Sequence, residues 1–261
     1  MVRKIVDVCM TVLLVCLMAY QVTGEALHEW FGIAMTVLVI VHQILNRKWY
    51  SALFKGQYHA YRIVTTVNDV VLLLALGLTA FCGMSMSSHA VPFLYGMAKL
   101  TFARRMHLSM SYWAFLIMGL HLGLHIPVMF AGSRLSDRTK TILSAVFCIS
   151  AGIGLRLFLR DKVADYLFFR VPFAFLDYEK AGALVFLENI LQLSFWAFLG
   201  AQLAVICRNS QRKNEKKNSL LPVVFILLAI LLGVILTMTD GKETKDPMAG
   251  WGTSLSGDVS T

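Results

Sequence analysis

The sequence predicts an all-α integral membrane protein, a bundle of about seven transmembrane helices. Of its 261 residues, 57% are hydrophobic and only 15% are charged, which is far from the composition of soluble domains. Apolar runs of roughly 20 residues, the length that crosses a bilayer, recur along the chain. Helices are expected for these runs, because each backbone polar group in lipid must be satisfied within its own segment.

Seven apolar runs are candidate spans: 5–22, 27–46, 64–85, 105–130, 141–159, 181–206 and 220–239. The first follows a basic N-terminus, as in a signal peptide, but no small-residue cleavage site follows it, so an uncleaved span is expected. Residues 160–178 mix charged and aromatic side chains, which favours an amphipathic segment on the membrane surface, with a re-entrant segment as the alternative.

Three regions follow from this pattern. Residues 1–207 form a membrane domain, residues 208–239 a basic cytoplasmic loop with one additional span, and residues 240–261 a flexible tail with few apolar residues. More than half of the Lys and Arg residues lie inside if the N-terminus is cytoplasmic. The expected location is therefore the cell membrane, with several passes and an extracytoplasmic C-terminus.

The net charge of +9 does not indicate a nucleic-acid partner, because the basic residues lie mostly in short segments between apolar runs. Membrane lipid is the expected surrounding, and basic flanks of this kind orient spans within it. The five cysteines contain no C-x-x-C pair. A disulfide framework, a structural zinc site and a c-type haem attachment are therefore unsupported.

Two of the runs carry the same histidine repeat. His28 and His42 are fourteen residues apart in the second run, as are His107 and His121 in the fourth. Fourteen residues return a helix to within ~40° of the same face and advance it by ~21 Å. The two runs cross in the same direction, so two imidazoles are expected to face each other at each of two depths. That arrangement suits two haems, each iron bound by neutral imidazole from both sides.

Small and basic residues next to the histidines extend the haem hypothesis. Gly32, Gly119 and Gly123 leave the backbone bare where the edge of a macrocycle is expected. Arg104 and Arg105 are well placed to pair with haem propionates. Ordinary interfacial basic residues are an equal alternative for this arginine pair.

The histidine that binds the inner iron stays open between two candidates. His125 lies one turn after His121, so either could reach the metal. The equal fourteen-residue spacing in the two runs favours His121. His125 would then bond a propionate or a quinone, or only pack against its neighbours. Zinc and di-iron enzymes also use H-x-x-x-H, but they need further ligand clusters that this sequence lacks. Asp69 and Glu188 lie inside predicted spans. Three roles stay open for them: proton relay, quinone binding, or only a hydrogen bond to a neighbouring helix.

Residues 27–49 and 104–125 resemble the flavinylation-associated membrane b-type cytochromes, a family long catalogued only as a domain of unknown function. The motifs are H-E-W-x-G and H-x-x-x-N-x-x-W in the second run, and H-L-G-L-H in the fourth. The similarity covers roughly residues 5–205, a six-helix cytochrome-like core; the seventh span and the tail depart from it. More distantly, the chain is similar to ferric-reductase-like and other di-haem cytochrome b membrane domains.

The resemblance implies electron transfer through two b-type haems with His28, His42, His107 and His121 as iron ligands. It implies a membrane quinol or a cytoplasmic donor, and an extracytoplasmic flavoprotein with covalent FMN as acceptor. The sequence has no nucleotide-binding fingerprint, and residues 256–261 lack the Ala-Thr of a flavin attachment sequence. Any flavin is therefore expected on a partner, and the chain is expected to be an electron-transfer subunit.

The position of each histidine pair predicts the direction of electron flow. The quinol is expected to donate at the His42–His121 haem, which a lipid-soluble molecule can approach from the side. The His28–His107 haem begins close to the outer surface and is expected to pass electrons to the flavoprotein. The alternative function is a membrane transporter or scaffold whose histidines bind a transition metal or relay protons.

Overall fold

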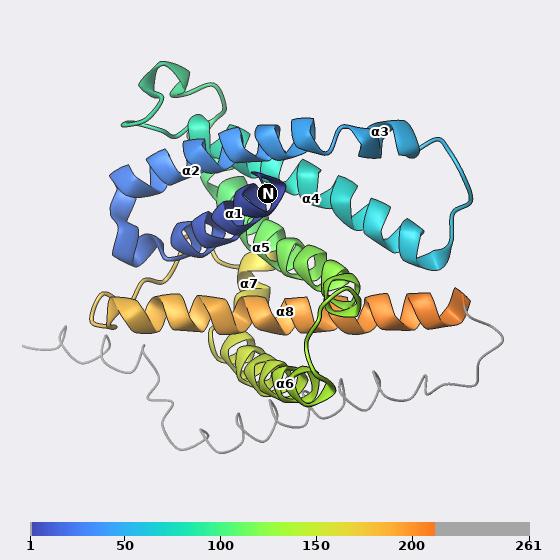
Figure 1. The fold of residues 1–261 in the computed structure, drawn as a ribbon. Coiled ribbons are helices and arrows are strands. Elements are labelled where there is room, and N and C mark those ends of the chain that lie inside the picture. The colour runs from blue at the N-terminus through green and yellow to red at the C-terminus, as the bar shows by residue number, and fades with distance from the viewer. Residues whose placement is uncertain (1, 212–261) are drawn as a thin grey trace, which may run out of the picture.

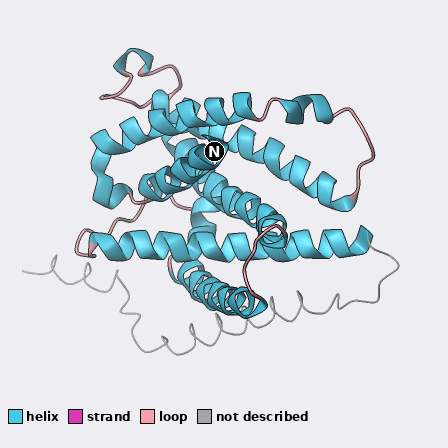
Figure 2. Ribbon diagram, viewed as in Figure 1, coloured by secondary structure: helices cyan, strands magenta, loops and turns pink. Residues whose placement is uncertain are grey.

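The computed structural model describes residues 2–211. In that range the secondary structure is helical, with loops between the helices and no strand (Figure 2). Five helices are long and apolar enough to cross a membrane: α2 (Tyr20–Leu45), α4 (Ala60–Met84), α5 (Leu100–Ala131), α6 (Asp137–Arg160) and α8 (Gly182–Gln211). The chain therefore has the character of an all-helical, multi-pass membrane protein. Each of these helices overlaps a predicted span, with ends that differ by one to seven residues.

Four shorter pieces complete the described chain: α1 (Val2–Met18), α3 (Lys48–Ala52), the 3₁₀ turn η1 (Pro92–Leu94) and α7 (Val163–Leu167). Helix α1 has 17 residues and covers most of the predicted span 5–22. The predicted span 220–239 and the predicted tail 240–261 lie outside the described residues.

The helix ends follow local sequence signals. Gly24 has φ 70° and ψ 175°, which kinks α2 near its start, between the predicted spans 5–22 and 27–46. Glycine adopts a positive φ without the steric cost that a side chain brings. Ser136 caps α6 by accepting a hydrogen bond from the backbone N–H of Thr139 at 3.2 Å.

Helix α8 lies between α5 and α6 and packs closely on both (Figure 1). A Cβ atom added at Gly123 of α5 would lie 2.0 Å from the carbonyl oxygen of Ala197, and one at Gly119 would lie 2.5 Å from Cβ of Trp196. Small residues at this spacing allow two helices to approach closely in a membrane. Gly119 and Gly123 are thus explained by helix packing, which corrects the predicted role beside a macrocycle.

Helices α1 and α2 form an antiparallel hairpin that packs less closely on the other helices. Helix α2 has one buried residue, Met35, and it makes no close backbone packing with α5. The hairpin is joined to the rest through side chains: buried residues of α1, α2, α4, α5, α7 and α8 form a single hydrophobic cluster. The two histidine-bearing helices therefore face each other across a layer of side chains.

The segment after α6 is built into one end of the bundle. In α7, Val163, Tyr166 and Leu167 are buried, and the carbonyl of Leu167 accepts hydrogen bonds from Ser109 Oγ at 2.9 Å and Trp113 Nε1 at 3.0 Å. The middle of the predicted surface segment 160–178 is therefore anchored to α5.

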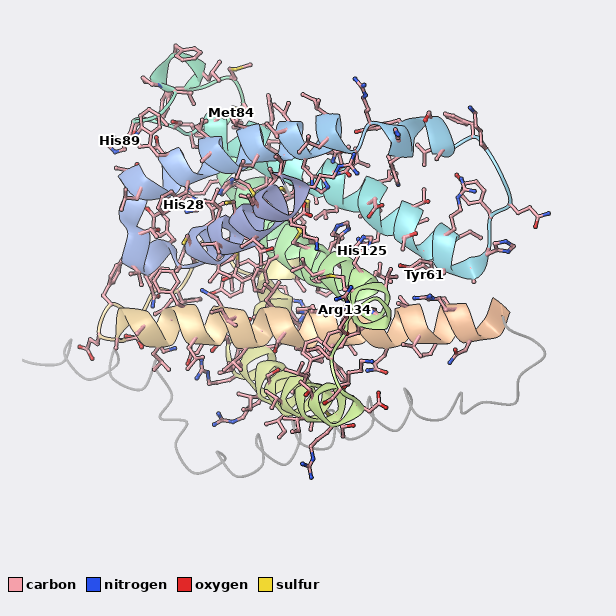
Figure 3. All side chains as sticks on the ribbon, viewed as in Figure 1. His28, Tyr61, Met84, His89, His125 and Arg134 are labelled. Carbon is pink, nitrogen blue, oxygen red and sulfur yellow. The ribbon has the colours of Figure 1, made fainter. Side chains whose placement is uncertain are left out.

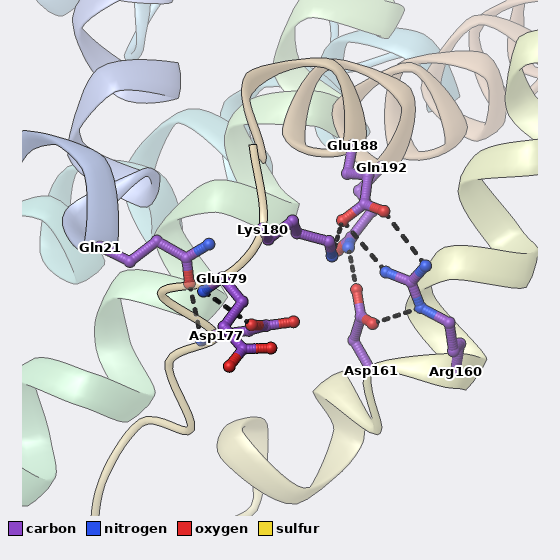
Figure 4. A network of polar contacts seen from close by, with 8 residues as sticks. All are labelled: Gln21, Arg160, Asp161, Asp177, Glu179, Lys180, Glu188 and Gln192. Atoms are coloured by element: carbon purple, nitrogen blue, oxygen red, sulfur yellow. Dashed lines mark hydrogen bonds and ion pairs between the residues drawn. The ribbon is translucent and has the colours of Figure 1, made fainter. Parts of the chain in front are cut away.

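A polar network closes the same end of the bundle (Figure 4). Arg160 forms ion pairs with Asp161 at 2.7 Å and with Glu188 at 3.1 Å, and Lys180 also pairs with Glu188. Gln192 donates to Asp161 at 2.9 Å. The carboxylate of Glu188 is therefore occupied by two cations, so the network supports a structural role rather than proton relay or quinone binding.

Candidate functional site

The candidate histidines gather at two depths of the bundle. We call the level of His28 and His107 the His28 end, and the level of His42, His121 and His125 the His42 end. In Figure 3, His28 and His125 lie well apart in the bundle. The kink in α2 precedes His28, and the proline within α5 follows His125, so unbroken helix joins the two levels on both sides. The ~21 Å separation expected from helical rise therefore applies.

At the His28 end, two histidines from different helices meet. The ring centroids of His28 and His107 are 5.9 Å apart, with the rings nearly perpendicular. A metal ion held between two imidazoles, at about 2 Å from each ligating nitrogen, places the ring centres roughly 6 Å apart. The spacing therefore suits a shared metal. Nδ1 of His28 is buried and has no hydrogen-bond partner among the described residues.

The backbone of α4 fixes the ring of His107. Its Nδ1 donates to the carbonyl oxygen of Thr79 at 2.9 Å, which leaves Nε2 free to bind a metal. Gly83 makes room for the ring, because a Cβ atom there would lie 3.0 Å from Cε1 of His107. The predicted site residue Gly32 lies one turn after His28, and nothing lies within 4 Å of a Cβ added there.

Glu29, next to His28, ties the loop after α4 to α2. Its Oε2 accepts from Ser87 Oγ at 2.7 Å and from the backbone N–H groups of His89 and Ala90, both at 2.8 Å. Its Oε1 accepts from the N–H of Ser88 at 3.0 Å. The carboxylate is therefore saturated by the loop. The sequence argument missed this role, although Glu29 stands within the H-E-W-x-G motif.

At the His42 end, α1 contributes an aspartate. Nδ1 of His42 bonds Oδ1 of Asp7 at 2.9 Å. The side-chain amide of Asn46 lies 3.3 Å from Nε2 of His42 and donates more closely, at 2.9 Å, to the carbonyl of the same residue. The contact of Nε2 of His42 with the Asn46 amide, at 3.3 Å, is therefore long for a hydrogen bond. Asp7 was also missed from the sequence, although a carboxylate in an apolar run is a signal in itself.

Helix α4 supplies the matching aspartate for α5. Oδ1 of Asp69 accepts a hydrogen bond from Nδ1 of His121 at 2.9 Å, so this ring also has its Nε2 free. The ring of His125 lies 4.8 Å from that of His121, edge to face. His125 is also close enough to Asp7 and His42 to interact with them electrostatically. Asp69 of α4 therefore bonds a histidine on the neighbouring helix α5, one of the roles predicted for it.

The two predicted propionate partners point in different directions. Arg105 is two residues before His107, about 200° around the helix axis, whereas Arg104 is within about 60°. Arg105 lines an open groove of about 430 Å³ with Lys99, Thr101, Phe102, Met106 and Phe169. The structure therefore supports Arg104 better than Arg105 as a neighbour of the His28–His107 pair. The remaining histidines, His59 and His89, lie outside the long helices and are exposed.

Within residues 2–211, one group of three ligands has its candidate atoms within 4.8 Å of one another: Glu25, Glu29 and His89. The candidate haem histidines belong to no such compact group in this range. Three of these histidines are too far apart to chelate one small ion together. The arrangement that their spacing allows is one pair at each level, with one histidine from α2 and one from α5.

The fold defines the class of the protein as a multi-pass, all-helical membrane protein with paired histidines between its helices. Comparison with protein-family models, curated proteins and solved structures finds no match. Function is therefore inferred from the residues of this chain themselves.

Proposed function

We propose that this chain is a membrane cytochrome that carries electrons through two b-type haems, each bound by two histidines. The observation that carries the proposal is the His28–His107 pair, with ring centroids 5.9 Å apart on two helices that do not pack closely. A second observation supports it: three of the four candidate ligands bond an acceptor through Nδ1, which orients Nε2 for a metal.

The residues fit the group in a consistent way. His28 and His107 would hold one haem, and His42 and His121 the other, while Gly32 leaves space beside the first. Apolar side chains of the bundle pack between and around the histidine-bearing helices. When bound, the haems supply the redox chemistry. The chain fixes the ligands, the distance between them and the low dielectric around them.

The finer topology belongs to the same proposal. Helix α1, at 17 residues, is long enough for the lower limit of a span, and residues 220–239 would add a seventh. With the N-terminus in the cytoplasm, the His28 end faces the extracytoplasmic side of the cell membrane. This arrangement agrees with the resemblance of residues 5–205 to flavinylation-associated b-type cytochromes.

Quinol and an extracytoplasmic flavoprotein carrying FMN are the proposed partners. The His42 end lies next to lipid-facing side chains, such as Ile40 and Ile44, which are exposed on α2. A lipid-soluble donor can reach it from the side. The His28 end lies near the end of the bundle, where a partner can approach without entering lipid. The chain would thus be the membrane subunit of an oxidoreductase system.

Haem content tests the proposal directly. Protein purified from haem-replete cells is expected to be red, with two low-spin b-type haems per chain on reduction. His28→Ala or His107→Ala is expected to remove one haem, and His42→Ala or His121→Ala the other, because each loses one axial ligand. His59→Ala, which changes an exposed loop histidine, is the matched control and should keep both. Folded, colourless wild-type protein would overturn the proposal in favour of a transporter or scaffold.

A further inference from the structure

The two histidine pairs differ in what their Nδ1 atoms bond. At the His42 end, both candidate ligands bond a carboxylate: Asp7 for His42 and Asp69 for His121, each at 2.9 Å. At the His28 end no carboxylate bonds an imidazole. His107 donates to the backbone carbonyl of Thr79, and Nδ1 of His28 has no partner among the described residues.

This difference affects how strongly each pair stabilises an oxidised iron. A carboxylate that accepts from Nδ1 shifts electron density toward Nε2 and makes the imidazole a stronger donor. Its negative charge also favours the more positive, oxidised state of a nearby metal, most strongly where the dielectric is low. A neutral backbone carbonyl strengthens the imidazole as a donor only weakly, and it has no negative charge to favour the oxidised metal.

We infer that Asp7 and Asp69 are positioning residues that hold the reduction potential of the His42–His121 haem below that of the His28–His107 haem. This inference rests on the proposed function and deepens it. Electrons entering at the His42 end then move downhill to the His28 end. The direction of flow is set by side chains of this chain, in addition to the partners at either side.

Other charged groups lie at both levels, but within the described residues none of them bonds a candidate ligand directly. The carboxylate of Glu29 is next to His28 and acts on that imidazole electrostatically, although it is engaged by four loop groups. Arg104 is exposed at that end. At the His42 end, Arg208 lies over the ring of Tyr61 at 5.9 Å, and within the described range it pairs with neither aspartate. The direct bonds from Asp7 and Asp69 to the two ligands therefore set the expected order.

The two aspartates are expected to contribute unequally. The side chain of Asp69 is 23% exposed, whereas that of Asp7 is 49% exposed. In the proposed topology Asp7 lies in the first two turns of α1, next to Arg3 and Lys4 at the cytoplasmic surface, where water and salt screen its charge more strongly than that of Asp69 within α4. Asp69 should therefore have the larger influence on the potential.

Redox titration of the purified, haem-loaded protein tests the inference. In Asp69→Asn the amide oxygen can still accept from Nδ1, so the ring stays oriented while the charge is lost. The lower of the two midpoint potentials is expected to rise in Asp69→Asn, to rise less in Asp7→Asn, and to stay low in Asp69→Glu. Asp137→Asn, which removes a fully exposed charge on α6, should change neither potential.

Single-haem backgrounds assign the shift to one site. In His107→Ala, which should keep only the His42–His121 haem, adding Asp69→Asn is expected to raise the remaining potential. In His121→Ala the same addition should leave the remaining potential unchanged. A shift in the second background, or two loaded haems whose potentials ignore both aspartates, would overturn this inference alone. Absence of haem from the wild-type protein would instead overturn the proposed function.

Discussion

At the scale of single residues, the structure distinguishes two neighbouring histidines, of which the sequence favours one only through its spacing. His121 and His125 are one turn apart on α5, and their rings are 4.8 Å apart. Only His121 bonds Asp69, which fixes its ring as a metal ligand is usually fixed. Within the described chain His125 has no such acceptor, which leaves it available to bond a propionate or a quinone.

We therefore expect His125→Ala to keep both haems, while His121→Ala loses the one at the His42 end. The reason is that His121 alone of the two has its Nδ1 held and its Nε2 directed by Asp69. Haem content by pyridine haemochrome assay, together with the reduced absorbance bands, measures the difference. The opposite pattern, with one haem lost in His125→Ala and two kept in His121→Ala, would move the ligand one turn along α5.

At the scale of helices, the closest packing involves α8 rather than the histidine-bearing pair. Gly123 and Gly119 of α5 meet Ala197 and Trp196 of α8, and Gly154 of α6 meets the carbonyl of Leu191 on the same helix. At these positions the absence of a side chain lets the backbones of the three helices approach closely. They provide the rigid part of the bundle on which His107 and His121 are carried.

Gly123→Ala is expected to destabilise the protein by about 1–3 kcal/mol, the usual cost of overpacking a well-packed interior. The added Cβ would lie 2.0 Å from the carbonyl oxygen of Ala197, so α5 and α8 would have to move apart. Thermal unfolding in detergent measures the effect.

Gly77→Ala on α4 is the matched control for the same measurement. Nothing lies within 4 Å of a Cβ added there, and alanine is the better helix former by about 1 kcal/mol. The control should be neutral or slightly stabilising. Equal losses in the two variants would show that helix packing at Gly123 is not the cause.

At the scale of the whole molecule, the sequence predicts the parts better than their contacts. Run length and hydropathy locate α2, α4, α5, α6 and α8, because a span needs about 20 apolar residues. The fourteen-residue repeat predicts that His28 and His107 share a level, and their rings do meet. Helical periodicity is a property of one segment, so the depth of each histidine along its helix can be predicted without knowledge of the neighbouring helices.

Contacts between segments are where the sequence argument fails. Asp7 reaches His42 across 35 residues of chain, and Glu29 reaches the 87–90 loop across about 60. Gly119 and Gly123 are near a histidine in the sequence but face α8 in the fold. The face that a helix presents to each neighbour depends on the packing of the whole bundle, which no local pattern specifies.

Electron flow in oriented vesicles tests the function of the molecule as a whole. A quinol is expected to reduce both haems, and an external flavoprotein carrying FMN is expected to reoxidise them, because the His28 end is proposed to face outward. Absorbance at the reduced b-type bands follows both steps, and His107→Ala vesicles, which lack the outer haem, should be reduced but not reoxidised. Reoxidation by a cytoplasmic acceptor and not by the external one would reverse the assigned direction.

The loose seating of α2 against α5 has a consequence for how the molecule is made. The α1–α2 hairpin is joined to the rest of the bundle mainly through side chains. In each histidine pair, one residue lies on the hairpin and the other on α5. A group bound by both His28 and His107 would fasten the hairpin to the other helices, and its binding free energy would count toward folding. Cofactor supply would then affect biogenesis: in chains made without haem, side-chain packing and the bonds of Glu29 alone would hold the hairpin, and membrane proteases would reach it more easily.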